Sequence, residues 1–310
     1  MKVVVSEFMD EHALEAFGHR AEIVYDPSLV DNREALLAAL SNADALIVRN
    51  RTRVDAALLE RAPGLRVVGR LGVGLDNIDM AACAQRDVAV KPATGANTLA
   101  VAEYTVSATL ALLRGAYASN HAMVAGEWPR NALIGREAAG RVMGLVGLGS
   151  IARAVADRAR ALGMGIAAFD PHLPGDDAAW QGVRRCTIDE LLPICDVLSL
   201  HVPLTDETRG LISRDALSRM KAGAILINTA RGGIVDEAAL IRALKEGKLG
   251  GAALDVFETE PLTAEAGARF RDIPNLILTP HVAGLTDESN IRTSTVTVQN
   301  VLGELAHAAA

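Results

Sequence analysis

Aromatic residues and cysteines are scarce in this chain. Its 310 residues include 2 Trp, 3 Tyr and 5 Phe, so few rings are present to stack on nucleic-acid bases. The 3 cysteines, Cys83, Cys186 and Cys195, form no even set and no C-x-x-C pair, which argues against a disulfide framework and a zinc site. We therefore expect no metal site, and we interpret the cysteines as core residues.

The chain also has no excess of positive charge and no long apolar run. Lys and Arg number 31 against 38 Asp and Glu, so no global positive field attracts nucleic acid or anionic lipid. The most apolar segment, residues 106–113, is far shorter than the roughly 20 residues of a membrane span. The N-terminal apolar stretch is too short for a signal peptide. These shortages predict a cytoplasmic protein without nucleic-acid or membrane partners, in which an anionic substrate needs a local basic site.

Short β-branched runs alternate with helical patterns along the chain, which is long enough for about two domains. The predicted strands of the first half are KVVVSEF, AEIVY, DALIVRN, LRVVGRLG and VAVKPA. After a long helical pattern at 97–119, six more follow: RVMGLVGLGSIA, MGIAAFD, DVLSLHVP, AILINTARGG, GGAALDVFE and NLILTPH. This βαβ rhythm predicts an α/β protein with doubly wound parallel sheets, a binding cleft between the halves at the carboxyl ends of the strands, and one C-terminal amphipathic helix.

A glycine-rich turn begins the second series of strands. Gly147 and Gly149 follow the apolar run 142–146 in the pattern G-x-G-x-x-A, and a helical pattern comes next. Gly147 permits a tight turn, and Gly149 lets the backbone approach a pyrophosphate at the helix N-terminus. Ala152 replaces the usual third glycine with another small residue. The pattern predicts a dinucleotide-binding turn.

An acidic residue follows the next predicted strand. Asp170 lies 23 positions after Gly147, close to the roughly 20 expected for the carboxylate that binds the adenosine ribose diol. The next arginine is Arg184, so the sequence near Asp170 offers no obvious cation to bind the 2′-phosphate of NADP, and NAD is favoured as the cofactor. The alternative is that Asp170 only caps the turn before Pro171.

Three chemically useful residues follow three of the predicted strands. Arg231, Glu260 and His281 each come after an apolar run, so we expect them near one edge of the sheet. Arg231 can bind a carboxylate bidentately, and His281 can give a proton to a forming alkoxide. Glu260 can hold the other imidazole nitrogen and favour the protonated ring. Taken singly, they have plainer alternatives as a helix cap, a solvated acid and a buried polar residue. Together they predict a catalytic triad for a nicotinamide-dependent reaction.

Seven segments carry a family resemblance that covers essentially the whole chain. They are GRLGVGLDNID (69–79), ANTLAVAE (96–103), GLVGLGSIA (144–152), HVPLTDETRGLI (201–212), NTARGGIVDE (228–237), ALDVFETEP (253–261) and TPHVAG (279–284). On these motifs the chain resembles the D-2-hydroxyacid dehydrogenase family, most closely its 3-phosphoglycerate dehydrogenase-like branch. The resemblance implies the triad roles above.

The resemblance also implies cofactor contacts, domain order and assembly. The implied cofactor residues are Gly147, Gly149, Ser150, Ile151, Asp170, Val202, Pro203, Thr229, Ala230, Asp255 and Gly284, with Asp255 accepting a bond from the nicotinamide carboxamide. A Rossmann-type NAD domain at 98–285 is expected to be inserted into a flavodoxin-like substrate domain made of 1–97 and 286–310. A homodimer assembled around the long helix is implied as well.

A basic loop follows the third predicted strand. Arg49, Arg51 and Arg53 alternate in VRNRTRVD, so they share a face in extended chain. The resemblance places this loop on the substrate side, together with the backbone of Val73 and Gly74. We predict that Arg49 and Arg51 bind a second anionic group of the substrate; salt bridging at the surface is the alternative. Candidates are 3-phosphohydroxypyruvate, sulfopyruvate and an oxaloacetate-like acid.

Other functions remain open at this level. A glyoxylate or hydroxypyruvate reductase would use a substrate with one anion. A formate dehydrogenase of the same architecture typically has Gln at the position of Glu260, which counts against it. A non-enzymatic NAD(H)-sensing protein of the corepressor type keeps the triad but usually carries extra terminal segments. The residues favour an NAD-dependent enzyme that interconverts a D-2-hydroxy acid and its 2-oxo acid.

Overall fold

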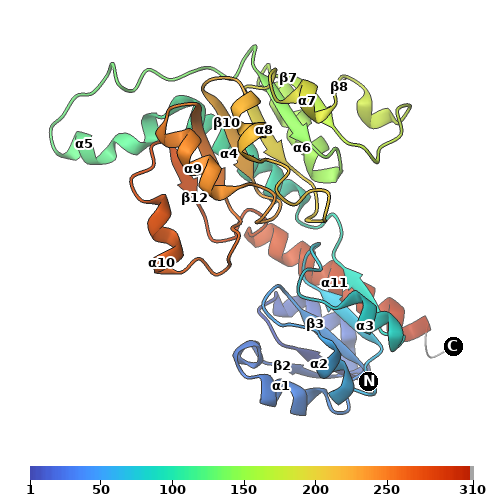
Figure 1. Cartoon of the computed structure of the whole chain (residues 1–310). Coiled ribbons are helices and arrows are strands. Elements are labelled where there is room, and N and C mark those ends of the chain that lie inside the picture. Colours follow the sequence, from blue (N-terminus) through green and yellow to red (C-terminus); the bar gives the residue numbers. More distant parts are fainter. Residues whose placement is uncertain (308–310) are drawn as a thin grey trace. The chain divides into compact units, whose positions relative to one another are not determined.

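The computed structural model describes residues 1–307, which divide into two compact units. Unit 1 comprises Met1–Asn97 and the C-terminal segment that starts at Leu285, and unit 2 comprises Thr98–Gly284. Each unit is built around one sheet of parallel strands (Figure 1). In chain order, unit 2 is therefore inserted between the two segments of unit 1.

Unit 1 contains a five-stranded sheet with the order β2-β1-β3-β4-β5. Its strands are β1 (Lys2–Val5), β2 (Glu22–Tyr25), β3 (Ala45–Val48), β4 (Val67–Arg70) and β5 (Ala89–Pro92). All neighbouring pairs are parallel, and every residue of β3 and β4 is buried. A strand covered on both faces tolerates a continuous apolar run, which explains ALIV in β3. The order is that of flavodoxin-like sheets, as the family resemblance implies.

The helices of unit 1 come from both ends of the chain. They are η1 (Glu11–Arg20), η2 (Pro27–Asp31), α1 (Arg33–Leu40), α2 (Ala56–Arg61), α3 (Met80–Gln85) and α11 (Asp287–His307). The Thr286 hydroxyl accepts the Ser289 N–H at 3.0 Å and caps the start of α11. Val298, Val301 and Leu305 of α11 are buried against the sheet. This helical spacing of apolar residues outweighs the strand preference of the Thr- and Val-rich sequence.

Unit 2 contains a seven-stranded sheet with the order β12-β11-β10-β9-β6-β7-β8. Its strands are β6 (Val142–Val146), β7 (Gly165–Phe169), β8 (Arg184–Arg185), β9 (Val197–Leu200), β10 (Ala224–Asn228), β11 (Leu249–Leu254) and β12 (Leu276–Leu278). The sequence predicts six of them in the doubly wound Rossmann arrangement. It misses β8, a two-residue edge strand with exposed arginines and no apolar run.

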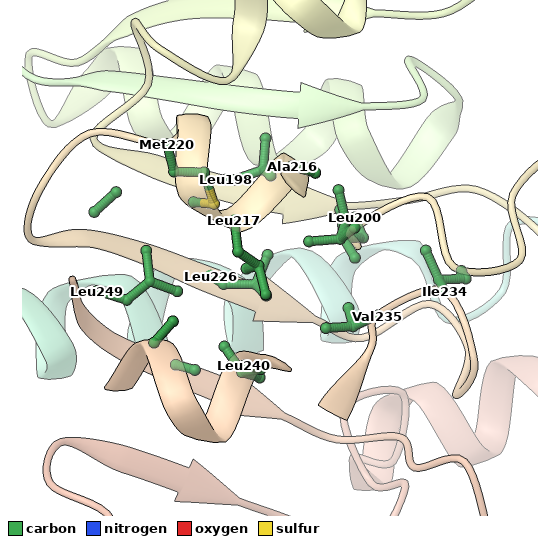
Figure 2. Close-up of a cluster of buried hydrophobic side chains, with 14 of the residues drawn as sticks. Leu198, Leu200, Ala216, Leu217, Met220, Leu226, Ile234, Val235, Leu240 and Leu249 are labelled. Carbon is green, nitrogen blue, oxygen red and sulfur yellow. The ribbon is translucent and has the colours of Figure 1, made fainter. Parts of the chain in front are cut away.

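Helices cover both faces of this second sheet (Figure 1). They are α4 (Thr98–Arg114), η3 (Ala116–Ser119), α5 (Asn120–Val124), α6 (Ser150–Ala161), η4 (Ala178–Trp180), α7 (Ile188–Leu191), α8 (Arg214–Arg219), α9 (Glu237–Lys245), α10 (Ala264–Gly267) and η5 (Ala268–Phe270). Figure 2 shows one core, where Leu198, Leu200 and Leu226 of the strands meet Leu217, Met220 and Leu240. Burial of such side chains contributes roughly 1.5–3 kcal/mol each.

The long helical pattern at 97–119 is interrupted once in the structure. Helix α4 ends at Arg114, because Gly115 adopts a left-handed conformation with φ of 62°. The chain continues through η3 and α5, which extend away from the rest of unit 2 in Figure 1. In residues 1–307 no helix combines the length and the apolar character that crossing a membrane requires.

Candidate active site

The glycine-rich turn joins β6 to α6 as the sequence predicts. Gly147 has φ of 86°, and a Cβ there would lie 2.6 Å from the carbonyl oxygen of His201, so only glycine fits. Gly149 precedes the first residue of α6, and a Cβ there would meet no described atom within 4 Å. Ala152 is fully buried and permits close packing of the helix on the sheet. The turn leaves backbone N–H groups at a helix start open to an anion.

Asp170, directly after β7, binds two stretches of backbone. Its Oδ1 accepts the N–H groups of His172 and Leu173 at 3.0 and 3.1 Å, so it caps the turn that follows the strand. Its Oδ2 accepts the Leu148 N–H of the glycine-rich turn at 2.8 Å. A carboxylate offers about four acceptor positions, so Oδ2 retains one for a hydroxyl such as that of a ribose.

The end of β10 holds an unpaired buried hydroxyl. Thr229 Oγ1 is buried and has no hydrogen-bond partner among the described residues. The Asn228 side chain shapes this turn, since it accepts the Ala230 N–H at 3.0 Å and donates to the Arg231 carbonyl at 2.9 Å. An unsatisfied buried polar atom is costly and marks a place where a ligand can bind. Together with the open turn at Gly147, it fits a dinucleotide.

The other implied cofactor residues lie at the same strand ends of unit 2. Ser150 and Ile151 form the first turn of α6, and the Ser150 hydroxyl accepts a bond from Thr98 Oγ1 at 3.4 Å. Val202 and Pro203 follow β9, and Val202 Cγ1 lies 2.9 Å from the position of a Cβ at Gly147. Gly284 is the last residue of unit 2. Within the described residues, no group of three or more His, Cys, Asp or Glu side chains is placed to hold a metal ion.

Arg231 and Glu260 lie on loops that touch through their backbones. Arg231 follows β10, and its Nη1 donates to the Ala230 carbonyl at 2.5 Å. A Cβ at Gly232 would lie 1.7 Å from the carbonyl oxygen of Phe257, so glycine is required there. Phe257 in turn donates its N–H to Glu260 Oε1 at 3.0 Å. Gly232 therefore brings the arginine loop directly against the loop that carries the glutamate.

His281 and Glu260 form a hydrogen-bonded pair. His281 Nδ1 lies 2.7 Å from Glu260 Oε2, and both side chains are about one-third exposed. Partial burial alone would raise the pKa of the Glu260 carboxyl, but the contact with His281, the Phe257 N–H and Arg231 outweigh it and lower that pKa. Glu260 is thus held as a carboxylate that orients the ring. With Nδ1 engaged, Nε2 is the nitrogen that remains to exchange a proton with a substrate.

Asp255 fixes the turn on which His281 sits. His281 has φ of 56°, a left-handed conformation that is uncommon for residues other than glycine and typical of functional sites. The buried carboxylate of Asp255 accepts the Val282 and Ala283 N–H groups, both at 2.8 Å, and the Thr279 hydroxyl at 2.6 Å. Its carbonyl accepts the His281 N–H at 2.8 Å. This structural task stands beside the carboxamide contact that the resemblance implies.

Tyr104 of α4 extends this network and was missed from the sequence. Its hydroxyl lies 2.5 Å from Thr279 Oγ1, which in turn donates to Asp255. Burial raises the pKa of the Tyr104 hydroxyl, so it stays protonated and able to donate. The two residues are 175 positions apart, and no local pattern connects them.

In unit 1, a buried glutamate organises the basic loop. Glu7 is 5% exposed and accepts four backbone N–H groups: those of Arg49 and Thr52 through Oε1, and those of Asn50 and Arg51 through Oε2. The distances run from 2.8 to 3.3 Å. The loop conformation thus depends on one carboxylate, which the sequence did not single out.

The two arginines predicted to bind the second anion have different partners. Arg49 donates to the Phe8 carbonyl at 3.2 Å and to Asn290 Oδ1 at 2.9 Å, and burial lowers the pKa of its guanidinium. Its charge interacts with the Glu7 carboxylate, which opposes this lowering, but in the described part of the chain no direct ion pair forms between the two. Arg51 pairs with Asp31, and both side chains are exposed. Val73 and Gly74 follow β4 in the same unit, with Val73 exposed.

Comparisons with known proteins agree with the family predicted from the motifs. The model of the D-isomer specific 2-hydroxyacid dehydrogenase NAD-binding domain matches residues 106–283. An (S)-sulfolactate dehydrogenase of Chromohalobacter salexigens is 55% identical over 300 residues, 96% of each chain. A D-3-phosphoglycerate dehydrogenase of Archaeoglobus fulgidus is 37% identical over 97% of this chain, which spans only 57% of that relative.

A solved structure extends the agreement to the fold. The structure of D-lactate dehydrogenase from Aquifex aeolicus, complexed with NAD and lactic acid, aligns with a TM-score of 0.85 and 28% identity. The alignment covers 99% of this chain and 96% of the other. The expected fold class and reaction class are confirmed.

Proposed function

The chain belongs to the D-isomer specific 2-hydroxyacid dehydrogenase family, and from this premise we propose that it reduces a 2-oxo acid with NADH and oxidises the corresponding 2-hydroxy acid with NAD. We further propose that this substrate carries a second anionic group. The observation that carries the chemistry is the 2.7 Å contact between His281 and Glu260. When bound, the cofactor supplies the hydride for the carbonyl carbon. Arg231 binds the substrate carboxylate and polarises the carbonyl, and His281 gives its proton to the carbonyl oxygen. The product is the D-2-hydroxy acid, and the reverse steps oxidise it.

A sulfonate is the second anion that we favour. The relative named (S)-sulfolactate dehydrogenase matches nearly the whole of both chains at 55% identity. In sulfolactate the carbon that bears sulfur takes priority over the carboxyl carbon, so the S label describes the spatial arrangement of D-lactate. The name is therefore consistent with a D-specific family. In this chain the Arg49 guanidinium donates to a carbonyl and an amide oxygen and forms no direct ion pair within the described residues, which suits a sulfonate.

NADH oxidation with a panel of 2-oxo acids tests this function. We expect kcat/KM for sulfopyruvate to exceed that for glyoxylate and hydroxypyruvate by at least about tenfold, because a second charge-assisted contact contributes roughly 1.5–3 kcal/mol. Oxaloacetate and 3-phosphohydroxypyruvate serve as dianions of other shapes. Absorbance at the nicotinamide band reports each rate. Equal values for mono- and dianionic acids would contradict the second anion, and the chain would then be a glyoxylate or hydroxypyruvate reductase.

The same panel tests the choice of NAD over NADP. The acceptor position left on Asp170 Oδ2 suits a ribose hydroxyl, whereas a 2′-phosphate would meet a carboxylate of like charge. We expect NADH to support a higher kcat/KM than NADPH by about 100-fold, consistent with a charge repulsion of a few kcal/mol. If kcat/KM is nearly the same with NADH and NADPH, Asp170 does not select the cofactor by binding the ribose hydroxyl.

We propose that the protein is a cytoplasmic homodimer formed through unit 2. The segment after α4 exposes large apolar side chains, with Tyr117 and Trp128 at 73%, Ile134 at 80% and Val124 at 89%. A pocket of about 550 Å³ opens beside it, between the end of α4 and residues 132–136. Such exposure marks an interaction surface.

Light scattering tests the dimer. We expect the wild-type protein to have twice the mass of one chain, and the double variant Val124→Glu, Trp128→Glu to have the mass of one chain. A monomeric wild-type protein would contradict the dimer.

A further inference from the structure

A buried carboxylate at the start of α9 belongs to none of the groups described above. Glu237 is the first residue of that helix and is 2% exposed. Burial raises the pKa of its carboxyl, against the opposing effects of the Glu258 N–H and Arg269. Burying a carboxylate is unfavourable unless it is paired and hydrogen-bonded, so its partners indicate what the position does.

Glu237, Glu258 and Arg269 form a closed set of contacts, the Glu237 clamp. Glu237 Oε1 accepts the Glu258 N–H at 2.6 Å, and Glu258 Oε1 accepts the Glu237 N–H at 3.3 Å. Arg269 of η5 forms an ion pair with Glu237 and lies 3.5 Å from Glu258 Oε2. Its guanidinium also stacks on the Phe270 ring at 5.1 Å. The clamp thus joins the start of α9, the loop after β11 and η5.

The loop held by the clamp is the one that carries Glu260. Glu258 lies two residues before Glu260, and Phe257, one residue earlier still, donates its N–H to the Glu260 carboxylate. The opposite side of Phe257 is fixed as well: its carbonyl meets Gly232, and its ring packs edge-on against Phe270 at 5.9 Å. The clamp and Gly232 therefore hold this loop from two directions.

We propose that Glu237, Glu258 and Arg269 are positioning residues that keep Glu260 against His281. This inference rests on the proposed role of Glu260. The pair can transfer a proton efficiently only if the carboxylate stays within hydrogen-bond reach of the ring, and a displacement of about 1 Å caused by a distant change can lower a rate by about 100-fold. A loose loop would leave cofactor binding intact, because the clamp touches none of the implied cofactor residues.

The variant Glu237→Gln with Arg269→Met removes both charges of the buried pair together. It leaves no unpaired buried charge and so has the best chance to fold. We expect kcat for 2-oxo acid reduction to fall by about tenfold or more, with NADH affinity by fluorescence titration unchanged within about twofold. Arg269→Lys keeps a positive charge beside Glu237, so we expect a smaller loss of kcat than in the double variant. Arg219→Met, which breaks the exposed ion pairs of Arg219 with Asp189 and Asp215, is the matched control and should keep full activity.

A double-mutant cycle with Glu260→Gln separates positioning from general destabilisation. If the clamp acts through Glu260, the Glu260→Gln variant should lose no further activity when Glu237→Gln and Arg269→Met are added to it. The same should hold when Arg269→Lys is added instead. Losses that multiply, or an unchanged kcat in the clamp variants, would overturn the inference. If Glu260→Gln alone keeps full activity, the proposed role of Glu260 fails instead.

Discussion

Replacing His281 with alanine is expected to lower kcat for 2-oxo acid reduction by about 10³-fold, within the range of general acid catalysis. In the proposed mechanism the imidazole supplies the proton, and its hydrogen bond with Glu260 orients the ring. NADH affinity should be preserved, because the turn around His281 is held by Asp255 through backbone N–H groups that alanine retains. Steady-state absorbance and fluorescence titration measure the two quantities.

Two further measurements sharpen the His281 result. Added imidazole should restore part of the activity of the alanine variant by occupying the space of the missing ring, and should leave the wild type unaffected. Glu260→Gln keeps the shape of the partner but not its charge, so we expect a smaller loss than for His281→Ala. A His281→Ala enzyme within about tenfold of wild-type kcat would end the assignment, because positioned proton transfer contributes more than that.

The strands were predictable because each is a short apolar run closed by a turn residue. All five runs of the first half and all six of the second became strands of two parallel sheets. A strand that is buried on both faces needs no alternation, so composition suffices to identify it. β8 escaped prediction because two exposed arginines at an edge leave no apolar pattern.

The candidate site was predictable where the chemistry is local to a motif. The turn at Gly147 and the residues that follow the strands need only the rule that parallel strands end at one edge. Contacts between distant segments leave no such pattern: Glu7 lies 42 positions from Arg49, and Glu237 lies 32 positions from Arg269. A buried carboxylate in the sequence resembles any surface acid until its partners are known.

Replacing Arg49 with methionine is expected to lower kcat/KM for sulfopyruvate by about 100-fold and to change that for glyoxylate by less than about threefold, which corresponds to one lost charge-assisted contact. Methionine retains apolar bulk but no charge. The Arg49 guanidinium donates to a carbonyl and an amide oxygen and interacts with the Glu7 carboxylate without a direct ion pair, so an anion can still bind it. The ratio of the two kcat/KM values is the measurement that matters, because a general loss of fold would lower both.

Arg51→Ala should have a smaller effect on the same ratio, because the Arg51 guanidinium already pairs with Asp31 at the surface. Exposed ion pairs of this kind contribute about 0–1 kcal/mol, so the protein should remain stable without it. Arg53→Ala serves as the matched control on the same loop. If Arg51→Ala leaves kcat/KM for every dianionic acid unchanged while Arg49→Met lowers it, binding of the second anion depends on Arg49 alone. In that case Arg51 only forms a surface salt bridge. If neither substitution changes the ratio, this loop does not recognise a second anion, and the preference for sulfopyruvate must arise elsewhere in the protein.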